Sequence, residues 1–339
     1  MDQKTGVLLI NLGTPDAPDK KSVYRYLKQF LLDPRVIDEP WLKRNLLVRG
    51  IIVPFRAKPS SDLYKQLWTE EGSPLKVFGY KLRDEVQNML GEHYVVELGM
   101  RYQNPSIESA IDKVIEQKVS RLLILPLFPQ YASATTGSVH EEVMRILSKR
   151  WEIPEVKMIN SFYDFPEMID AFVERGKQYE IDSYDHILFS YHGLPERQLI
   201  KADTSNHCLQ DESCCQNISE KNQFCYSAQC YATTAAITKK LNLSPDQYTV
   251  CFQSRLGKTP WIQPYTSDVL EALAEKGAKK ILVFCPAFIC DCIETTIEIS
   301  EEYQEEFEEM GGEKVQLVEG LNDHPLWINA VTTLVKGNL

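Results

Sequence analysis

The sequence predicts an α/β fold made of two similar, doubly wound domains, each built around a parallel sheet. Three pairs of apolar segments carry this prediction, because each segment is typical of a buried parallel strand that ends in a turn. The pairs are GVLLINLGTP (6–15) with HILFSYHGLP (186–195), VVELGMRYQNP (95–105) with YTVCFQSRLGKTP (248–260), and SRLLILPLFPQ (120–130) with KKILVFCPAFI (279–289). Their common order favours two copies of one Rossmann-like βα unit, the alternative being chance similarity of generic α/β patterns.

A helical stretch separates the last two segments of each set, SIESAIDKVIEQKV (106–119) in one and TSDVLEALAEKGA (266–278) in the other, with apolar residues at helical spacing. We expect an N-terminal domain at 1–164 and a C-terminal domain at 165–339. Ligands of such folds bind at the carboxyl ends of the strands. The sequence therefore predicts one ligand cleft between the domains, surrounded by residues 12–15, 101–102, 191–195, 253–255 and 286–294.

Composition limits the classes of partner. The chain has 339 residues, 43% of them hydrophobic, and a formal net charge of −11, which argues against binding to nucleic acid. Its first residues predict neither a signal peptide nor a membrane span, so we expect a cytoplasmic protein. Thiols stay reduced there, so the nine cysteines are expected to be free or metal-bound rather than paired in disulfides.

Residues 41–58, WLKRNLLVRGIIVPFRAK, combine five lysines or arginines with many apolar residues and no acid. One interpretation is a core-packing helix with a basic solvent face. The other is an apolar, basic lip that receives a flat apolar ligand or touches anionic lipid, which would make the protein peripheral to the inner membrane.

Two groups of residues have the chemistry of a catalytic or metal site. His192 directly follows an apolar strand, and an imidazole there can accept a proton or bind a divalent metal, although a structural histidine is the alternative. Glu294, Glu298 and Glu302 are four residues apart and therefore lie on one helix face. Such a face is usually solvated. Asp291 and Glu294, however, lie at the start of that helix, where its dipole favours negative charge, so a divalent-metal route is the second interpretation.

The loop QYASATTGS (130–138) has small residues and hydroxyl groups that permit close approach of a ligand, notably Ser133 and Thr135. It lacks the lysine of a phosphate-binding loop and any GxGxxG pattern, so support for a nucleotide site is weak. Arg101 suits either a ligand carboxylate or an ordinary ion pair.

Together these segments resemble the ferrochelatases, which insert ferrous iron into protoporphyrin IX to form protohaem, the terminal step of haem biosynthesis. The resemblance covers nearly the whole chain in the family's order. It rests on LINLGTP, FLLDPRVID, EEGSPL, GMRYQNPS, LPLFPQYASATTGS, FSYHGLPER, FQSRLGKTPW and DCIETTIEI.

The resemblance implies that His192 takes a pyrrole proton or binds the metal, with Glu294 as its acidic partner. It implies a metal route along Asp291, Glu298 and Glu302, and leaves open the porphyrin face at which iron enters. The predicted porphyrin-binding residues are Ser73, Arg101, Tyr102 and Trp261, from the resemblance, and Leu12, Ser133, Thr135 and Tyr191, from their places at strand ends and in the hydroxyl-bearing loop.

Two departures from the family pattern concern single residues. The sequence Asp291-Cys292-Ile293-Glu294 stands where many members have Asp-His-Ile-Glu, which removes one candidate imidazole and keeps the carboxylates. Leu12 replaces a familiar methionine, so no thioether is available there.

A third departure is an insertion of about residues 204–225. Tyr226 lies 34 residues after His192, whereas members without the insertion have this tyrosine soon after the histidine. The insertion is poor in apolar residues and holds Cys208, Cys214, Cys215 and Cys225. Their C-x5-C-C-x9-C spacing lacks the C-x2-C pairs of common zinc sites. Four thiolates fit a 2Fe-2S cluster. The chain resembles some bacterial ferrochelatases that carry such a cluster on an internal cysteine-rich insertion, and this resemblance implies a cluster here. Zinc and free thiols are the alternatives.

The sequence thus predicts a ferrochelatase that acts on Fe²⁺ and protoporphyrin IX. Coproporphyrin III is the alternative substrate, and a non-catalytic iron-sulfur or haem-responsive binding protein is the alternative from another class. Monomer and dimer remain equally open.

Overall fold

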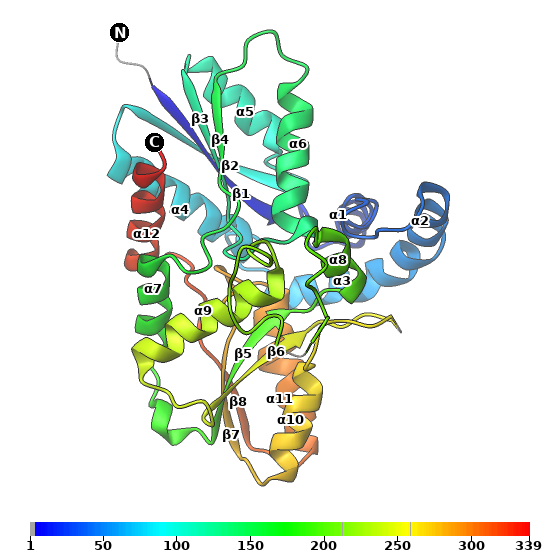
Figure 1. Ribbon diagram of the computed structural model, residues 1–339. Coiled ribbons are helices and arrows are strands. Elements are labelled where there is room, and N and C mark those ends of the chain that lie inside the picture. The colour runs from blue at the N-terminus through cyan, green and yellow to red at the C-terminus, as the bar shows by residue number, and fades with distance from the viewer. Residues whose placement is uncertain (1–3, 212, 258) are drawn as a thin grey trace. The chain divides into compact units, whose positions relative to one another are not determined.

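A computed structural model describes residues 4–211, 213–257 and 259–339 and contains two four-stranded parallel sheets (Figure 1). The strand order is β2-β1-β3-β4 in the first sheet and β6-β5-β7-β8 in the second. In both sheets the first strand along the chain lies between the second and the third, and the fourth strand pairs with the third. This common order confirms the prediction of two similar α/β folds.

The strands are β1 (Thr5–Gly13), β2 (Tyr94–Tyr102), β3 (Arg121–Pro126), β4 (Glu155–Met158), β5 (His186–His192), β6 (Tyr248–Gln253), β7 (Lys280–Phe284) and β8 (Lys314–Leu317). The α-helices are α1 (Lys20–Leu31), α2 (Trp41–Leu47), α3 (Val53–Leu67), α4 (Pro74–Leu90), α5 (Ile107–Glu116), α6 (Ser138–Leu147), α7 (Pro166–Gly176), α8 (Glu196–Ala202), α9 (Tyr226–Leu241), α10 (Thr266–Glu275), α11 (Tyr303–Glu309) and α12 (Pro325–Gly337). Three π-helical segments are η1 (Val48–Ile52), η2 (Ser133–Gly137) and η4 (Ile293–Glu302), and η3 (Ile181–Ser183) is a 3₁₀ turn.

The chain divides into two units. Unit 1 contains the described residues up to Phe128 together with Ala132–Ser161 and Trp327–Leu339, and unit 2 contains Pro129–Tyr131 and Phe162–Leu326. The chain therefore crosses between the units more than once, and most of α12 belongs to unit 1. A single boundary after residue 164 stays a prediction about the domains.

The first sheet is covered by helices on both faces. Leu8 and Ile10 of β1 pack with Ile111 of α5 and Val143 of α6 in one buried cluster. On the opposite face Gly79 of α4 lies so close to the sheet that a Cβ there would be 3.0 Å from Leu98 Cδ2. Alternating side chains of one strand thus serve two helical layers, as a doubly wound fold requires.

The second sheet has the same arrangement. Leu188 of β5 packs with Leu270 of α10, Ile299 of η4 and Phe307 of α11. On the other face Phe189 stacks on Phe284 with ring centroids 5.0 Å apart, and α7 and α9 cover this side. The carboxyl ends of β5, β6 and β7 consequently point toward one edge, where the chain places its candidate catalytic residues.

No helix in the described part of the chain has both the length and the apolar content needed to cross a bilayer.

Candidate active site

His192 is the last residue of β5, and its ring is fixed by its own backbone. Nδ1 lies 2.6 Å from the Gly193 carbonyl oxygen. Because a carbonyl only accepts hydrogen bonds, Nδ1 carries the proton, and Nε2 of the neutral ring then carries the lone pair. The rings of Trp261 and Phe288 lie beside it, each with its centroid 6.4 Å from the imidazole. The geometry therefore presents Nε2 as a proton acceptor or metal ligand in a largely apolar surrounding.

The turn after His192 is held from three directions. The Gly193 amide donates to the Gln253 carbonyl at 2.8 Å, and the Ile262 amide donates to the Leu194 carbonyl at 3.0 Å. The Tyr226 hydroxyl donates to the carbonyl of His192 itself at 2.9 Å. A Cβ at position 193 would lie 2.9 Å from the Gln253 carbonyl oxygen, so only glycine permits this close approach.

Glu294 lies in the first turn of the π-helix η4, and its backbone is tied to β6. The buried amide of Gln253 donates from Nε2 to the Glu294 carbonyl at 2.6 Å and to Glu298 Oε2 at 3.1 Å. Cys292, which precedes the helix, caps it with its side chain, and its backbone amide donates to Thr295 Oγ1 at 3.0 Å. Cys292 therefore has a structural task at the position where the family pattern often has histidine.

The predicted carboxylate face continues along η4 and α11. Glu298 accepts hydrogen bonds from Ser254 Oγ at 2.6 Å and from the Tyr303 hydroxyl at 3.4 Å. Burial, and then the neighbouring carboxylates led by Glu298, raise the pKa values of Glu302 and Glu306. These side chains repel one another when ionised, so a cation that binds along this face relieves an existing repulsion.

Asp291, the remaining member of the predicted metal route, is engaged within unit 2. Its oxygens accept hydrogen bonds from Asn322 Nδ2 at 2.7 Å, Thr295 Oγ1 at 3.0 Å and the Gly320 amide at 3.1 Å. This set of donors matches a carboxylate that anchors the loop before η4. A role of Asp291 in metal transfer stays a prediction.

The two predicted porphyrin-binding residues of unit 2 differ in exposure. Trp261 is 9% exposed and lies beside His192. Tyr191 is fully buried, and its hydroxyl pairs with Thr234 Oγ1 at 2.8 Å. Burial raises the Tyr191 pKa well above its ordinary value. Trp261 is therefore the better placed of the two to line a ligand pocket.

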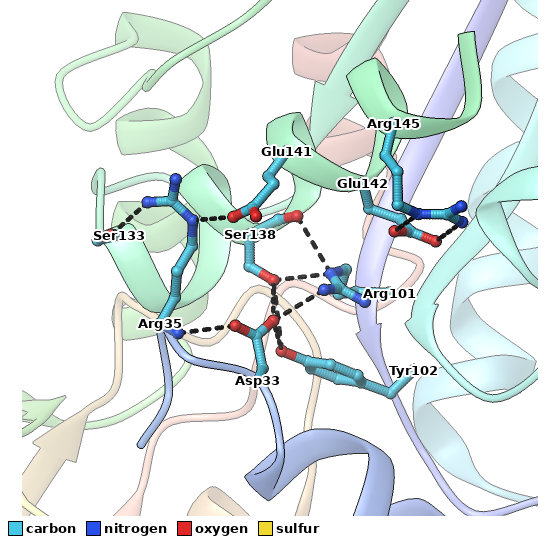
Figure 2. A network of polar contacts seen from close by, with 9 residues as sticks. All are labelled: Asp33, Arg35, Arg101, Tyr102, Ser133, Ser138, Glu141, Glu142 and Arg145. Atoms are coloured by element: carbon cyan, nitrogen blue, oxygen red, sulfur yellow. Dashed lines mark hydrogen bonds and ion pairs between the residues drawn. The ribbon is translucent and has the colours of Figure 1, made fainter. Parts of the chain in front are cut away.

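In unit 1, Arg101 and Tyr102 at the end of β2 belong to a buried network centred on Asp33 (Figure 2). Asp33 Oδ2 accepts hydrogen bonds from Arg101 Nη2 at 2.8 Å, the Tyr102 hydroxyl at 2.9 Å and Ser138 Oγ at 2.5 Å. Arg101 Nε also donates to Ser138 Oγ at 2.7 Å. A carboxylate of its own unit thus already neutralises the charge of Arg101, which the resemblance assigns to porphyrin binding.

The segment that supplies Asp33 also holds the hydroxyl-bearing loop. Arg35, two residues further on, donates from Nη1 to Ser133 Oγ of η2 at 2.8 Å and forms an ion pair with Glu141 of α6, as Figure 2 shows. Asp33 reaches Ser138 at the start of the same helix. The side chains of Asp33 and Arg35 therefore fix η2 and α6 against the end of β2.

The other predicted porphyrin-binding residues of unit 1 make local contacts. Ser73, 2% exposed, donates to Thr14 Oγ1 at 3.0 Å after β1. Thr135 Oγ1 lies 3.4 Å from the Ala132 carbonyl. Leu12 is half-buried near the end of β1. Their contacts with a porphyrin stay predictions.

The four cysteines of the insertion come together in unit 2. Cys214 Sγ and Cys215 Sγ are 3.4 Å apart. A hydrogen bond from Cys215 lowers the pKa of Cys225, and the same contact raises the pKa of Cys215. Burial, and then Cys215 and Cys214, raise the pKa of Cys208 to about 11. The four thiols are therefore electrostatic neighbours rather than scattered side chains.

The four cysteines match a 2Fe-2S cluster in the number and kind of their donor atoms. Four sulfurs, two for each iron, are the usual ligands of such a cluster. Within the described residues no group of three or more His, Cys, Asp or Glu side chains is placed to hold one metal ion.

A proton-accepting imidazole and a carboxylate-bearing helix at the strand ends of a parallel α/β sheet define an enzyme that moves protons or handles a divalent metal. Comparison with known proteins agrees. A family model described as Ferrochelatase matches residues 4–339.

Ferrochelatases of Coxiella burnetii (strain Dugway 5J108-111) and Legionella pneumophila (strain Lens) are each 46% identical to this chain. The first aligns over 342 residues, 100% of this chain and 95% of the relative, and the second over 333 residues, 98% and 99%. The chain belongs to the ferrochelatase family, and it is a metal-chelating lyase of haem biosynthesis.

Solved structures show the same fold. SirB from Bacillus subtilis with Fe³⁺ has a TM-score of 0.52 at 13% identity and covers 99% of this chain and 96% of its own. The sirohydrochlorin chelatase SirB from Bacillus subtilis subspecies spizizenii in complex with cobalt has a TM-score of 0.56 at 11% identity, with 99% and 95% covered. At these identities the likeness concerns the fold alone.

Two residues of the site have roles that the sequence does not reveal. Asp33 and Gln253 lie within recognised motifs, but Arg101 is 68 residues from Asp33 and Glu294 is 41 residues from Gln253 along the chain. Gln253 was expected near the ligand only as part of residues 253–255. No local pattern indicates that its amide joins two functional elements.

Proposed function

We propose that this ferrochelatase inserts Fe²⁺ into protoporphyrin IX and that His192 Nε2 accepts a pyrrole proton. The observation that carries this proposal is the Nδ1–H hydrogen bond to the Gly193 carbonyl, which leaves the lone pair on Nε2. Metal insertion releases two pyrrole protons for each iron bound, so the site needs a base as well as ligands that replace the water around the metal.

The carboxylates supply the second requirement. Glu294 and Glu298 are attached through Gln253 to the strand next to β5, so imidazole and carboxylates share one rigid frame. We assign Glu294 to the metal or to the second proton, and Glu298 and Glu302 to the approach of Fe²⁺. Carboxylate oxygens and imidazole nitrogens can replace water molecules bound to Fe²⁺, and such ligands can pass the ion from one to the next.

An anaerobic assay with matched porphyrins tests this function and its alternatives. Insertion of Fe²⁺ into protoporphyrin IX with a higher kcat/KM than into coproporphyrin III supports the proposal. The reverse preference assigns the other substrate. Porphyrin binding without turnover, in a preparation with intact His192 and Glu294, contradicts the catalytic proposal and favours a binding protein.

We further propose that Cys208, Cys214, Cys215 and Cys225 hold a 2Fe-2S cluster. Such a cluster transfers single electrons, whereas iron insertion transfers none, so its role here is structural or sensory. An absorption spectrum of protein purified without oxygen, with about two irons and two sulfides per chain, is the expected result. A colourless preparation that binds one zinc per chain contradicts it.

The lip at residues 41–58 supports a peripheral membrane contact. One face packs on unit 1, since Val48 and Val53 are fully buried in a cluster with Leu31. The large apolar side chains of the other face are widely exposed, from 56% at Ile51 to 69% at Trp41 and 75% at Phe55. Arg49 and Arg56 are exposed beside them. Apolar side chains flanked by cations are suited to an anionic lipid surface.

Sedimentation with vesicles tests the lip. We expect binding to vesicles in which about one lipid in three is anionic, and little binding to neutral vesicles. The double variant Trp41→Ser/Phe55→Ser should lose this binding. Trp151→Ser, which removes an exposed tryptophan elsewhere in unit 1, is the control. Such contact would make the protein peripheral to the inner membrane.

A further inference from the structure

We propose that Tyr226 is a positioning residue through which the cysteine-rich insertion controls the turn that carries His192. The inference rests on the proposed function, in which His192 is the base and the four cysteines bind a cluster. Its new element is the connection between the two sites, made by one hydroxyl group.

The contact at the active site is direct. Tyr226 is 8% exposed, and its hydroxyl donates to the His192 carbonyl at 2.9 Å. The His192 ring is in turn bound to the next carbonyl, that of Gly193, at 2.6 Å. Because ring and backbone are joined in this way, a rotation of the His192–Gly193 peptide moves Nε2.

The contact at the insertion is covalent. Cys225 is the N-cap of α9, and Tyr226 is the first residue of that helix. The predicted fourth cluster ligand and the residue that holds His192 are therefore consecutive. A sulfur fixed by iron restrains the Cys225 backbone, and with it the first turn of α9.

The rest of the insertion is linked to the same point. Asn222, 6% exposed, donates from Nδ2 to the Cys214 carbonyl at 2.9 Å, and its own carbonyl accepts from the Cys225 amide at 2.8 Å. A continuous path thus runs from Cys214 through Asn222, Cys225 and Tyr226 to His192. Each step is a hydrogen bond or a peptide bond, which is the physical continuity that coupling between sites requires.

The body of α9 stays anchored independently of the insertion's cysteines. Gln229, fully buried, accepts the Tyr131 amide at 2.6 Å, and Thr234 pairs with the Tyr191 hydroxyl at 2.8 Å. Loss of the cluster therefore loosens the first turn of the helix rather than the whole of it, and the Tyr226 hydroxyl is the group of that turn that touches the active site.

Hydrogen exchange on whole protein tests the connection without relying on turnover. In the wild type, removing the cluster with a chelator should speed amide exchange in residues 190–196 by about tenfold, the effect of losing one hydrogen bond. Tyr226→Phe, which keeps the ring, should show the fast exchange with the cluster present and no further change when it is removed. Tyr231→Phe removes a half-buried hydroxyl from the same helix and should behave as the wild type.

Kinetics give a second measurement. Tyr226→Phe with its cluster should have kcat lowered about tenfold and a porphyrin KM within about twofold of the wild type, because positioning acts on the reacting geometry and not on binding. The effects of cluster removal and of the substitution should not add, since both act through one contact.

The outcomes separate the inference from the proposed function. If the Tyr226→Phe protein holds its cluster and exchanges and turns over like the wild type, the coupling is wrong while the chelatase and its cluster stand. If cluster removal leaves exchange at 190–196 unchanged in the wild type, the coupling is equally wrong. An active protein that contains no iron and sulfide overturns the cluster, and the coupling with it, but leaves His192 as the base.

Discussion

Gln253 and Glu294 are joined by a 2.6 Å hydrogen bond from the side-chain amide of the first to the main-chain carbonyl of the second. The Gln253 main-chain carbonyl simultaneously accepts the Gly193 amide, and its Oε1 accepts Ser190 Oγ at 2.7 Å. One buried amide thus sets the distance between the strand that carries His192 and the helix that carries Glu294. Polar groups so completely paired are costly to remove, because each partner is left buried.

Gln253→Met should keep the volume and lose these side-chain bonds. We expect a stability loss of about 1–3 kcal/mol and a fall in kcat of about 10–100-fold, because the imidazole and carboxylates lose their common frame. Denaturant unfolding and anaerobic iron insertion measure the two effects. Gln247→Met, just before the same strand, removes an exposed amide and is the control. A variant of unchanged kcat would show that the frame does not matter to catalysis.

His192→Ala should abolish the proton acceptor while leaving the porphyrin site in place. General-base catalysis contributes about 10²–10⁴-fold, so kcat should fall by that factor, with porphyrin affinity, followed by fluorescence, nearly unchanged. His186→Ala tests the specificity of the effect, because His186 begins the same strand and bonds to Thr249 at 2.9 Å. Near-normal turnover of the His192 variant would refute its role as base.

Asp33→Ala should be among the most destabilising single substitutions of unit 1. The Asp33 side chain is 3% exposed and that of Arg101 16%, and removing one partner of a buried pair costs about 3–5 kcal/mol. Tyr102 loses its acceptor as well. Urea unfolding checks this, with Asp84→Ala, an exposed partner of Arg83, as control. A loss no larger than that of the control would mean that Arg101 is satisfied by other groups.

The carboxylates of η4 and α11 should make stability depend on pH and on cations. Folding raises the pKa values of Glu302 and Glu306, so the folded state favours their protonated form. Their contribution to stability is present below the unfolded pKa, about 4.5, and is lost as the pH rises through the raised values.

Glu302→Gln should therefore raise the unfolding temperature at pH 7 and leave it unchanged near pH 4. The gain should stay below about 0.5 kcal/mol, because the side chain is exposed and screened by solvent. A divalent cation should stabilise the wild type more than the variant at pH 7. Glu152→Gln, exposed in unit 1, is the control; a variant that is less stable than the wild type at pH 7 would contradict the repulsion.

The sheets were predictable from sequence because buried parallel strands are nearly continuous apolar runs. Segment 6–15 contains β1 except its first residue, segment 186–195 contains β5, and the helices expected at 106–119 and 266–278 are α5 and α10. The π-helical character of η4 was not predictable, since an acidic face repeating every four residues suits an α-helix equally well.

Side-chain partners across long sequence separations were equally beyond prediction. Asp33 and Arg35 follow α1 directly in the sequence, yet they contact residues 68 to 106 positions away. Tyr191 illustrates a second reason. The sequence shows that side chains of this strand alternate between two faces, but it does not show which face packs on α9. The Tyr191 ring is buried on that face, with its hydroxyl next to Thr234.

The two first strands end differently although they are built alike. The sequence is Asn-Leu-Gly at the end of β1 and Tyr-His-Gly where β5 ends and its turn begins, so Leu12 stands where His192 stands in the other half. If both halves descend from one duplicated ancestor, the imidazole was needed only once. The N-terminal copy then needs only an apolar residue at this position, and the chemistry of the pair rests on one half alone.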